Sequence, residues 1–158
     1  MALNLNQFAP NEPIDGLYVY QANLPQLHNP IISASQDSAL TYGAFVAIDT
    51  ASTNTDAPVV LQADVDDPVL GVIAYTPIKA QFGAGERVAI ARANDIIWKK
   101  KDSNAITAGA ALYFNSSNQV TATATPGDTI IGKAITAAAA ADGFVQVELG
   151  FQTTESEG

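Results

Sequence analysis

The chain contains no cysteine, a single histidine and few charged residues. Without cysteine it can form neither disulfides nor thiolate metal sites, so its stability must come from packing or oligomerisation. Only 15% of the 158 residues are charged, against about 25% in an average soluble domain. This deficit fits a protein whose outer faces meet other protein surfaces, and it equally fits a β-rich surface covered with hydroxyl and amide groups.

Lysine and arginine are missing from the first half of the chain. Residues 1–78 hold eight acidic residues and no basic one, whereas residues 79–133 hold all seven basic residues against four acids. The net charge of −9 argues against nucleic acid as a partner, because phosphate binding needs a basic face. Such segregation could steer head-to-tail contacts between identical subunits, or dock one face on a charged lattice. Loops that simply differ in sign are the plain alternative.

Long apolar runs and enzyme motifs are also absent. No window approaches the roughly 18 apolar residues of a membrane span, and the N-terminus has no signal-peptide pattern, so we expect a soluble protein without a membrane partner. There is no nucleotide-binding glycine loop, zinc-protease motif or nucleophile elbow. His28 lies in a turn-rich stretch between two prolines, which favours a polar loop residue over a catalytic one. We therefore expect no enzyme activity, no catalytic residue and no cofactor.

An internal repeat is the most informative feature that is present. It consists of three matched pairs of segments: 39–49 with 105–115, 67–74 with 128–135, and 85–91 with 143–149. The first pair shares the pattern A-[LI]-T-x-G-A-x-[VL]-x-[IF]-[DN], and the third places Gly85 opposite Gly143, which aligns Ile90 with Glu148. Each copy is typical of a turn, a strand, a loop, a glycine-centred strand, a further loop and a final strand.

Four glycines occupy matched positions in the two copies. Gly43 and Gly109 precede alternating apolar runs, where a residue with positive φ can begin a strand. Gly71 and Gly132 fall inside apolar β-branched runs, where an interior glycine marks a bulge or a close backbone approach. Such bulges bend strands around a small barrel, so these glycines are expected to be structural.

The remaining segments complete an all-β prediction. Residues 16–20 and 95–98 are further strand candidates, and the alanine run at 136–141 is predicted to be a loop or a single helical turn. Residues 1–14, with two prolines and several asparagines, are expected to form an extended N-terminal arm. We expect one β-domain over 15–151, with repeats at about 39–91 and 105–149, and a polar tail at 152–158.

The acidic group Asp64, Asp66 and Asp67 is a weak candidate for a metal site. Carboxylate oxygens are the ligands that a hard cation such as Ca²⁺ prefers, but the glycine and terminal glutamate of an EF-hand loop are absent. A solvated acidic turn ahead of Pro68 is the alternative that we favour. No metal is therefore expected.

The second cluster joins an aromatic residue to three lysines: Trp98, Lys99, Lys100 and Lys101. Such a cluster can hold single-stranded nucleic acid, although it is weak support in a protein of net charge −9. It can also be a strand end with a solvated lysine turn. The third reading is a docking contact in which the indole is a buried anchor and the lysines face an acidic neighbour. The sequence leaves the last two open.

The order of these segments resembles the small capsid decoration, or cement, proteins of tailed bacteriophages. The second half carries the resemblance best, in the stretches Ile106–Gly109, Leu112–Phe114, Ile131–Ala134 and Val145–Val147. The resemblance covers roughly residues 35–150. It implies a β-barrel or β-clip-like domain without catalytic residues, which oligomerises, commonly as a trimer, at three-fold positions of an expanded capsid.

The resemblance also implies a function and a set of contacts. The protein would be a virion structural protein, made in the host cytoplasm, that binds the outer capsid surface and stabilises the lattice of the major capsid protein. The arm, with Leu3, Leu5 and Phe8, could add a strand to an exposed sheet edge on the capsid. The Trp98 cluster is the other expected contact.

Other functions stay open at this point. A tail, baseplate or fibre component would also be β-rich, polar and oligomeric. A carbohydrate-binding β-domain for cell-surface attachment would need a row of exposed aromatic residues, whereas Trp98 and the tyrosines are scattered along the chain. A dUTPase-like hydrolase would need a glycine-rich C-terminal motif, which is absent.

Overall fold

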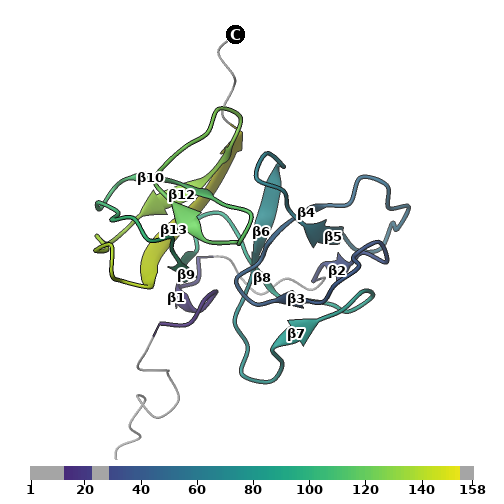
Figure 1. The fold of residues 1–158 in the computed structure, drawn as a ribbon. Helices are drawn as coiled ribbons and strands as arrows, with labels where there is room; N and C mark the ends of the chain where they lie inside the picture. Colours follow the sequence, from purple (N-terminus) through teal and green to yellow (C-terminus); the bar gives the residue numbers. More distant parts are fainter. Residues whose placement is uncertain (1–12, 23–28, 154–158) are drawn as a thin grey trace, which may run out of the picture.

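The computed structural model describes residues 13–22 and 29–153, and within these ranges the chain forms strands, turns and loops but no helix (Figure 1). No helix in this part of the chain could therefore cross a membrane. The strands are β1 (Tyr18–Tyr20), β2 (Ile31–Ile32), β3 (Leu40–Thr41), β4 (Phe45–Ile48), β5 (Val59–Gln62), β6 (Val69–Ile73), β7 (Gln81–Phe82), β8 (Ile90–Ala91), β9 (Ile96–Lys100), β10 (Ala111–Phe114), β11 (Val120–Thr121), β12 (Thr129–Ala134) and β13 (Phe144–Thr153). The predicted all-β class is confirmed.

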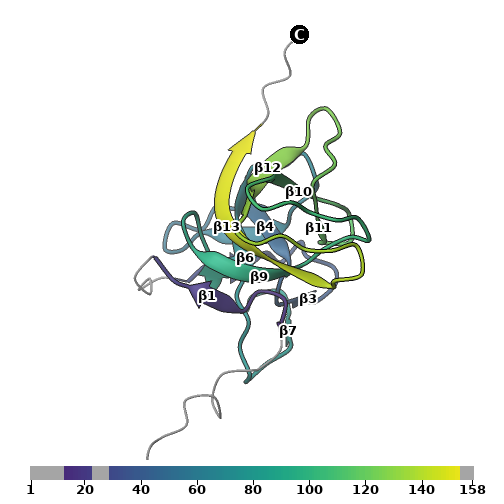
Figure 2. The same ribbon diagram turned by 90° about the vertical axis from the view of Figure 1, so that its left-hand side faces the viewer.

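The strands form two main sheets and one short ribbon. The first sheet has the order β1-β9-β13-β12-β10-β11, the second has the order β2-β5-β4-β6-β8, and β3 pairs with β7. β13 is ten residues long and bends strongly, because residues 144–148 pair with β9 and residues 147–153 pair with β12 (Figure 2). The first sheet therefore curls into a half-barrel. β13 also runs two residues into the expected C-terminal tail.

The two sequence copies have the same local hydrogen bonding. The Gly43 amide donates to the Ile73 carbonyl at 2.8 Å, and the Gly109 amide donates to the Ala134 carbonyl at 2.7 Å. Both glycines have positive φ, +87° and +82°. The predicted turn glycines thus begin β4 and β10 in the left-handed region that favours glycine.

The predicted bulge glycines also lie at matched places. Gly71 lies opposite Val46 in the β4–β6 pair, and Gly132 lies opposite Leu112 in the β10–β12 pair. The β4–β6 register shifts next to Gly71, and the β12–β13 register shifts next to Gly132. A Cβ on Gly132 would lie 2.1 Å from the Glu148 carbonyl oxygen, so only glycine fits there.

The third matched segment differs from its sequence alignment by one residue. Ile73 pairs with Ile90 in the first copy, whereas the corresponding Ala134 pairs with Val147 rather than with Glu148. Ile90 and Val147 are both buried, while Glu148 is partly exposed. The alignment that matches Gly85 with Gly143 is shifted by one residue from the structural equivalence. It therefore pairs buried positions of one strand with partly exposed positions of the other, because a shift of one residue turns every side chain to the opposite face.

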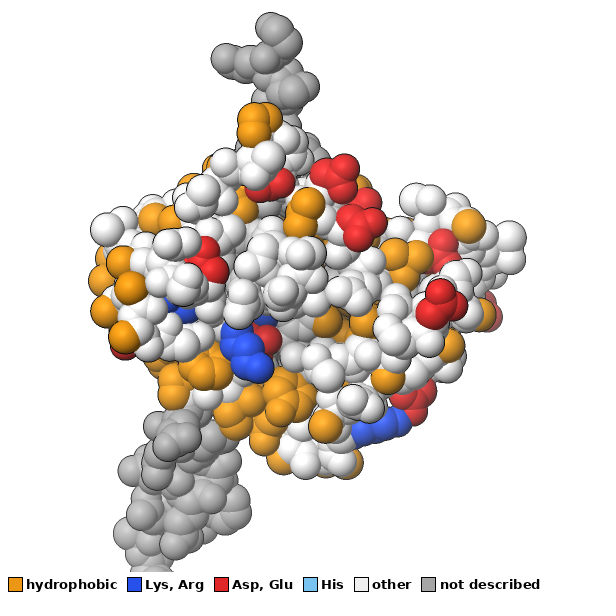
Figure 3. All heavy atoms as spheres, viewed as in Figure 1, with side chains coloured by type: hydrophobic (Ala, Val, Ile, Leu, Met, Phe, Trp, Pro, Cys, Tyr) orange, Lys and Arg blue, Asp and Glu red, His pale blue; other side chains and the backbone are white. Residues whose placement is uncertain are grey.

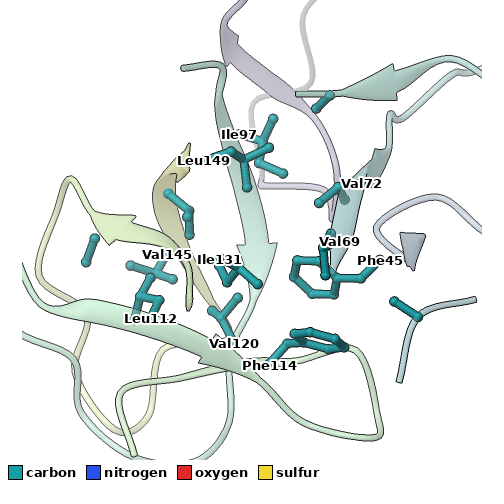
Figure 4. Close-up of a cluster of buried hydrophobic side chains, with 14 of the residues drawn as sticks. Phe45, Val69, Val72, Ile97, Leu112, Phe114, Val120, Ile131, Val145 and Leu149 are labelled. Atoms are coloured by element: carbon teal, nitrogen blue, oxygen red, sulfur yellow. The ribbon is translucent and has the colours of Figure 1, made fainter. Parts of the chain in front are cut away.

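The main hydrophobic core lies between the two copies (Figure 4). It includes Phe45 from β4 and Phe114 from β10, whose rings stack at a centroid distance of 4.4 Å. A smaller cluster lies in the first half of the chain, around Ile32 and Leu40. Neither sheet could bury its apolar face alone, so the two copies stabilise each other.

A buried lysine node and two exposed apolar surfaces

Lys99 is fully buried where the N-terminal segment meets the first repeat. β9 alternates, so Ile97 and Lys99 point into the protein. The Lys99 ammonium lies 2.8 Å from the Asp15 carboxylate, donates a hydrogen bond to the Gly43 carbonyl, and sits 4.8 Å from the centre of the Phe45 ring. We call this group of four residues the lysine node, and it ties three distant segments together.

Burial lowers the pKa of the Lys99 ammonium below its ordinary value, and the Asp15 carboxylate opposes that shift. Asp15 also accepts a hydrogen bond from the Lys100 amide at 2.9 Å, so its carboxylate has two donors. The Lys99 side chain has no exposed surface, and its ion pair with Asp15 attaches the N-terminal segment to the domain.

Two glycines allow the backbone to come this close to the node. A Cβ on Gly43 would lie 2.0 Å from an Asp15 carboxylate oxygen, and a Cβ on Gly16 would lie 2.6 Å from the Ile73 carbonyl. The Gly16 amide also donates to the Trp98 carbonyl at 2.8 Å. Asp15 and Gly16, which directly follow the predicted arm, are thus packed tightly against β6, β9 and the turn at Gly43.

Lys101 is also buried, and its ammonium hydrogen-bonds to the backbone at the end of the alanine-rich loop at 136–141. Its ammonium donates to the carbonyl oxygens of Asp102 at 2.8 Å, Asp142 at 3.0 Å and Ala140 at 3.4 Å. The alanine run forms a loop around a bridge at Ala138, as one of the two predicted alternatives had it.

The structure places the residues of the candidate docking contact on two sides of the chain, so the contact, which stays a prediction, rests on Trp98 and Lys100. Lys99 and Lys101 are 0% and 4% exposed, so neither can face an acidic neighbour. Trp98 is half-buried and Lys100 is exposed, and both lie on the outer side of β9. The strand predicted at 95–98 is β9, an internal strand of the larger sheet.

β1, β9 and β13 lie side by side in the first sheet (Figure 2), and several apolar side chains on or next to this sheet are exposed. Val19 is 45% exposed, Tyr20 is 59% exposed, and Ile135, which follows β12, is 37% exposed. We define the outer sheet face as these three residues together with Trp98 and Lys100. A hollow of about 410 Å³ borders it, lined by residues that include Trp98 and Pro13.

A second exposed apolar residue lies among acidic side chains on the other sheet. Ile48 is 53% exposed and lines a hollow of about 430 Å³ together with Asp49, Leu61, Asp67 and Leu70. We call this the acidic hollow. Figure 3 shows acidic side chains gathered over the upper and right-hand parts of the molecule, where Figure 1 places β4, β5 and β6.

The predicted metal candidates form a turn beside this hollow. The Asp64 amide donates to the Asp67 carboxylate at 2.8 Å, and the Asp67 amide donates to the Asp64 carbonyl at 3.0 Å. Asp66 is exposed. In the part of the chain that the structure describes, no three His, Cys, Asp or Glu side chains gather as metal ligands would.

Tyr18 points inward from β1, on the side opposite the outer sheet face. Its hydroxyl donates to the Ile90 carbonyl at 3.3 Å, which links β1 to the second sheet. Burial raises the pKa of Tyr18 to about 12; Asp95 adds to the shift and Arg92 opposes it. This hydrogen bond is a second attachment of the N-terminal segment, in addition to the lysine node.

Comparison with known proteins decides the family. The family model of the phage cement protein matches residues 28–149, which includes both repeats. The chain belongs to the phage cement protein family. None of the curated proteins matches the chain. The predicted resemblance is confirmed, and with it a phage structural role for this cement protein; β1 and Asp15 precede the matched residues.

Four of the residues considered in the sequence lie where the structure describes nothing. Leu3, Leu5, Phe8 and His28 lie outside the described residues. The lysine node was not predicted, although the sequence carries a signal for it. The period-two pattern of residues 96–100 places Lys99 on the same side as Ile97, and a lysine on the buried side of a strand requires an acidic partner.

Proposed function

We propose that this cement protein binds the outer surface of a phage capsid and stabilises the lattice of the major capsid protein, as a homo-oligomer and most simply as a trimer. The observation that carries the proposal is the family match across both repeats. The protein would be made in the host cytoplasm and would join the virion at the capsid.

The mechanism is adhesion, and the fold supports it. The two repeats share one core, so the domain can transmit load between neighbouring capsid subunits without deforming. Separating two bridged subunits would then also expose the interfaces between cement protein and capsid. An interface of about 800 Å² per partner suffices for specific binding, and many copies act together on one capsid.

The N-terminal segment is the proposed capsid contact. Residues 1–12 contain Leu3, Leu5 and Phe8, and an extended segment can add a strand to a sheet edge through main-chain hydrogen bonds. The lysine node fixes the root of this segment at Asp15. Force on the segment would therefore reach the domain through a buried ion pair.

A truncation tests the proposal. Deleting residues 1–12 removes the segment but keeps Asp15, Gly16 and β1, so the domain should keep its melting temperature. Co-sedimentation with expanded capsids should then fall to background. Deleting residues 154–158 is the matched control and should leave binding unchanged. Full capsid occupancy by the N-terminal truncation would refute the assigned contact, and no binding by the intact chain would refute the function.

A further inference from the structure

Two surfaces of the molecule expose apolar side chains without a described partner. Five large hydrophobic side chains are exposed among the described residues, and three of them, Val19, Tyr20 and Ile135, belong to the outer sheet face. Ile48 is the fourth and lies in the acidic hollow, while Ile78 lies in neither. Exposed apolar side chains that cluster in this way mark interaction surfaces.

The two surfaces are complementary in charge. No lysine or arginine occurs in residues 1–78, so the acidic hollow, with Asp49 and Asp67, has no basic residue from its own half of the chain. The outer sheet face carries Lys100, whereas Lys133 of the same sheet is paired with Glu148 at 3.7 Å and adds no net charge. A basic, apolar surface and an acidic, apolar surface attract each other.

One molecule cannot bring these surfaces together. β1, β9 and β13 lie on the left of Figure 1, and β4 and β5 lie on the right. A two-fold dimer built on either surface would pair that surface with itself: like charges oppose the acidic hollow against itself, and the outer sheet face against itself would leave the acidic hollow uncovered. The contact that satisfies both surfaces is heterologous, with the outer sheet face of one copy against the acidic hollow of the next.

We propose that the outer sheet face binds the acidic hollow of a second copy, so that subunits associate head to tail and close into a ring. A heterologous contact closes when its rotation fits a whole number of subunits. The proposal rests on the homo-oligomer part of the proposed function and names its two mating surfaces. Capsid binding does not enter it.

Light scattering and sedimentation of three single variants test the proposal. Val19→Glu places a charge on the outer sheet face, and Ile48→Glu adds a carboxylate to the acidic hollow beside Asp49 and Asp67. Each should weaken association at least roughly tenfold, because an unpaired charge would be buried in the contact. Ile78→Lys is the control: its parent side chain is 92% exposed and lies in neither surface, so association should be unchanged.

Mixing the two defective variants gives a sharper result. The Val19→Glu copy keeps an intact acidic hollow and the Ile48→Glu copy keeps an intact outer sheet face, so the mixture can form one good contact, while the two substituted surfaces carry like charges and repel each other. It should give a heterodimer that cannot grow further. Homodimers of either variant alone would contradict a heterologous contact.

Other outcomes identify a different occupant and overturn the proposal. An intact chain that stays monomeric but associates after deletion of residues 1–12 would show that its own N-terminal segment covers the outer sheet face. Variants that keep their oligomer but lose capsid binding would show that the face contacts the capsid. A chain that is monomeric at every concentration, yet binds capsids, would overturn this inference and leave capsid cementing intact.

Discussion

Replacing Lys99 with methionine tests the structural importance of the lysine node. Methionine keeps most of the side chain's volume and removes the ammonium. The Asp15 carboxylate, in a residue that is 8% exposed, would lose its cation, and the Gly43 carbonyl would lose its donor. Removing one member of a buried ion pair costs about 3–5 kcal/mol, because the other charge stays buried without compensation. Lys99→Met should therefore lower the free energy of unfolding by roughly that amount.

Urea unfolding of four chains separates this effect from lost packing. Adding Asp15→Asn to Lys99→Met removes the stranded charge while the amide oxygen can still accept from the Lys100 amide. The double variant should recover part of the loss. Lys100→Met, on the exposed side of the same strand, should change stability by less than about 0.5 kcal/mol. A loss below about 1 kcal/mol in Lys99→Met would show that the Lys99–Asp15 ion pair contributes little to stability. A double variant no more stable than Lys99→Met would show that the Asp15 charge is not what destabilises the single variant.

Three further predictions concern glycine, pH and the alanine-rich loop. Gly43 and Gly109 have similar φ, but an added Cβ would meet other atoms within 4 Å only at Gly43. Gly109→Ala should therefore lower the free energy of unfolding by about 1–2 kcal/mol, and Gly43→Ala should lower it distinctly more. Equal losses of stability in chemical unfolding would show that the close contacts at Gly43 do not matter. The pKa of Tyr18 is near 10 in the unfolded chain and about 12 in the folded one, so the free energy of unfolding should fall as the pH rises from 10 to 12. Tyr18→Phe should remove that fall. Identical pH profiles of stability for the two chains would show that folding does not raise the pKa of Tyr18. The Asp142 amide donates to the Ala139 carbonyl within the alanine-rich loop, and the Lys101 ammonium donates to the Asp142 carbonyl. Lys101→Met should therefore speed hydrogen exchange of the Asp142 amide. An unchanged exchange rate would show that the ammonium does not hold the loop in place.

The repeat predicted much of the fold because its signals are local. The turn glycines, the bulge glycines and the alternating runs depend on neighbours within a few residues, and the strands at Phe45–Ile48 and Ala111–Phe114 follow them closely. The third pair of segments was out of phase by one residue. Matching glycines gave that alignment, whereas burial of Ile90 and Val147 sets the real register.

The candidate site could be predicted less well because it depends on long-range pairing. Residues 16–20 and 95–98 were both predicted as strands, but nothing local shows that β1 pairs with β9. That pairing brings Asp15 to Lys99 and turns an expected docking lysine into a buried structural one. Trp98 and Lys100 stay candidates for contact because they lie on the other side of the same strand.

Differential scanning calorimetry of expanded capsids, with and without bound protein, tests capsid cementing most directly. We expect saturating protein to raise the temperature at which the capsid lattice comes apart, and the chain lacking residues 1–12 to leave that temperature unchanged. Capsids that bind the full chain to saturation and still come apart at the original temperature would contradict the account.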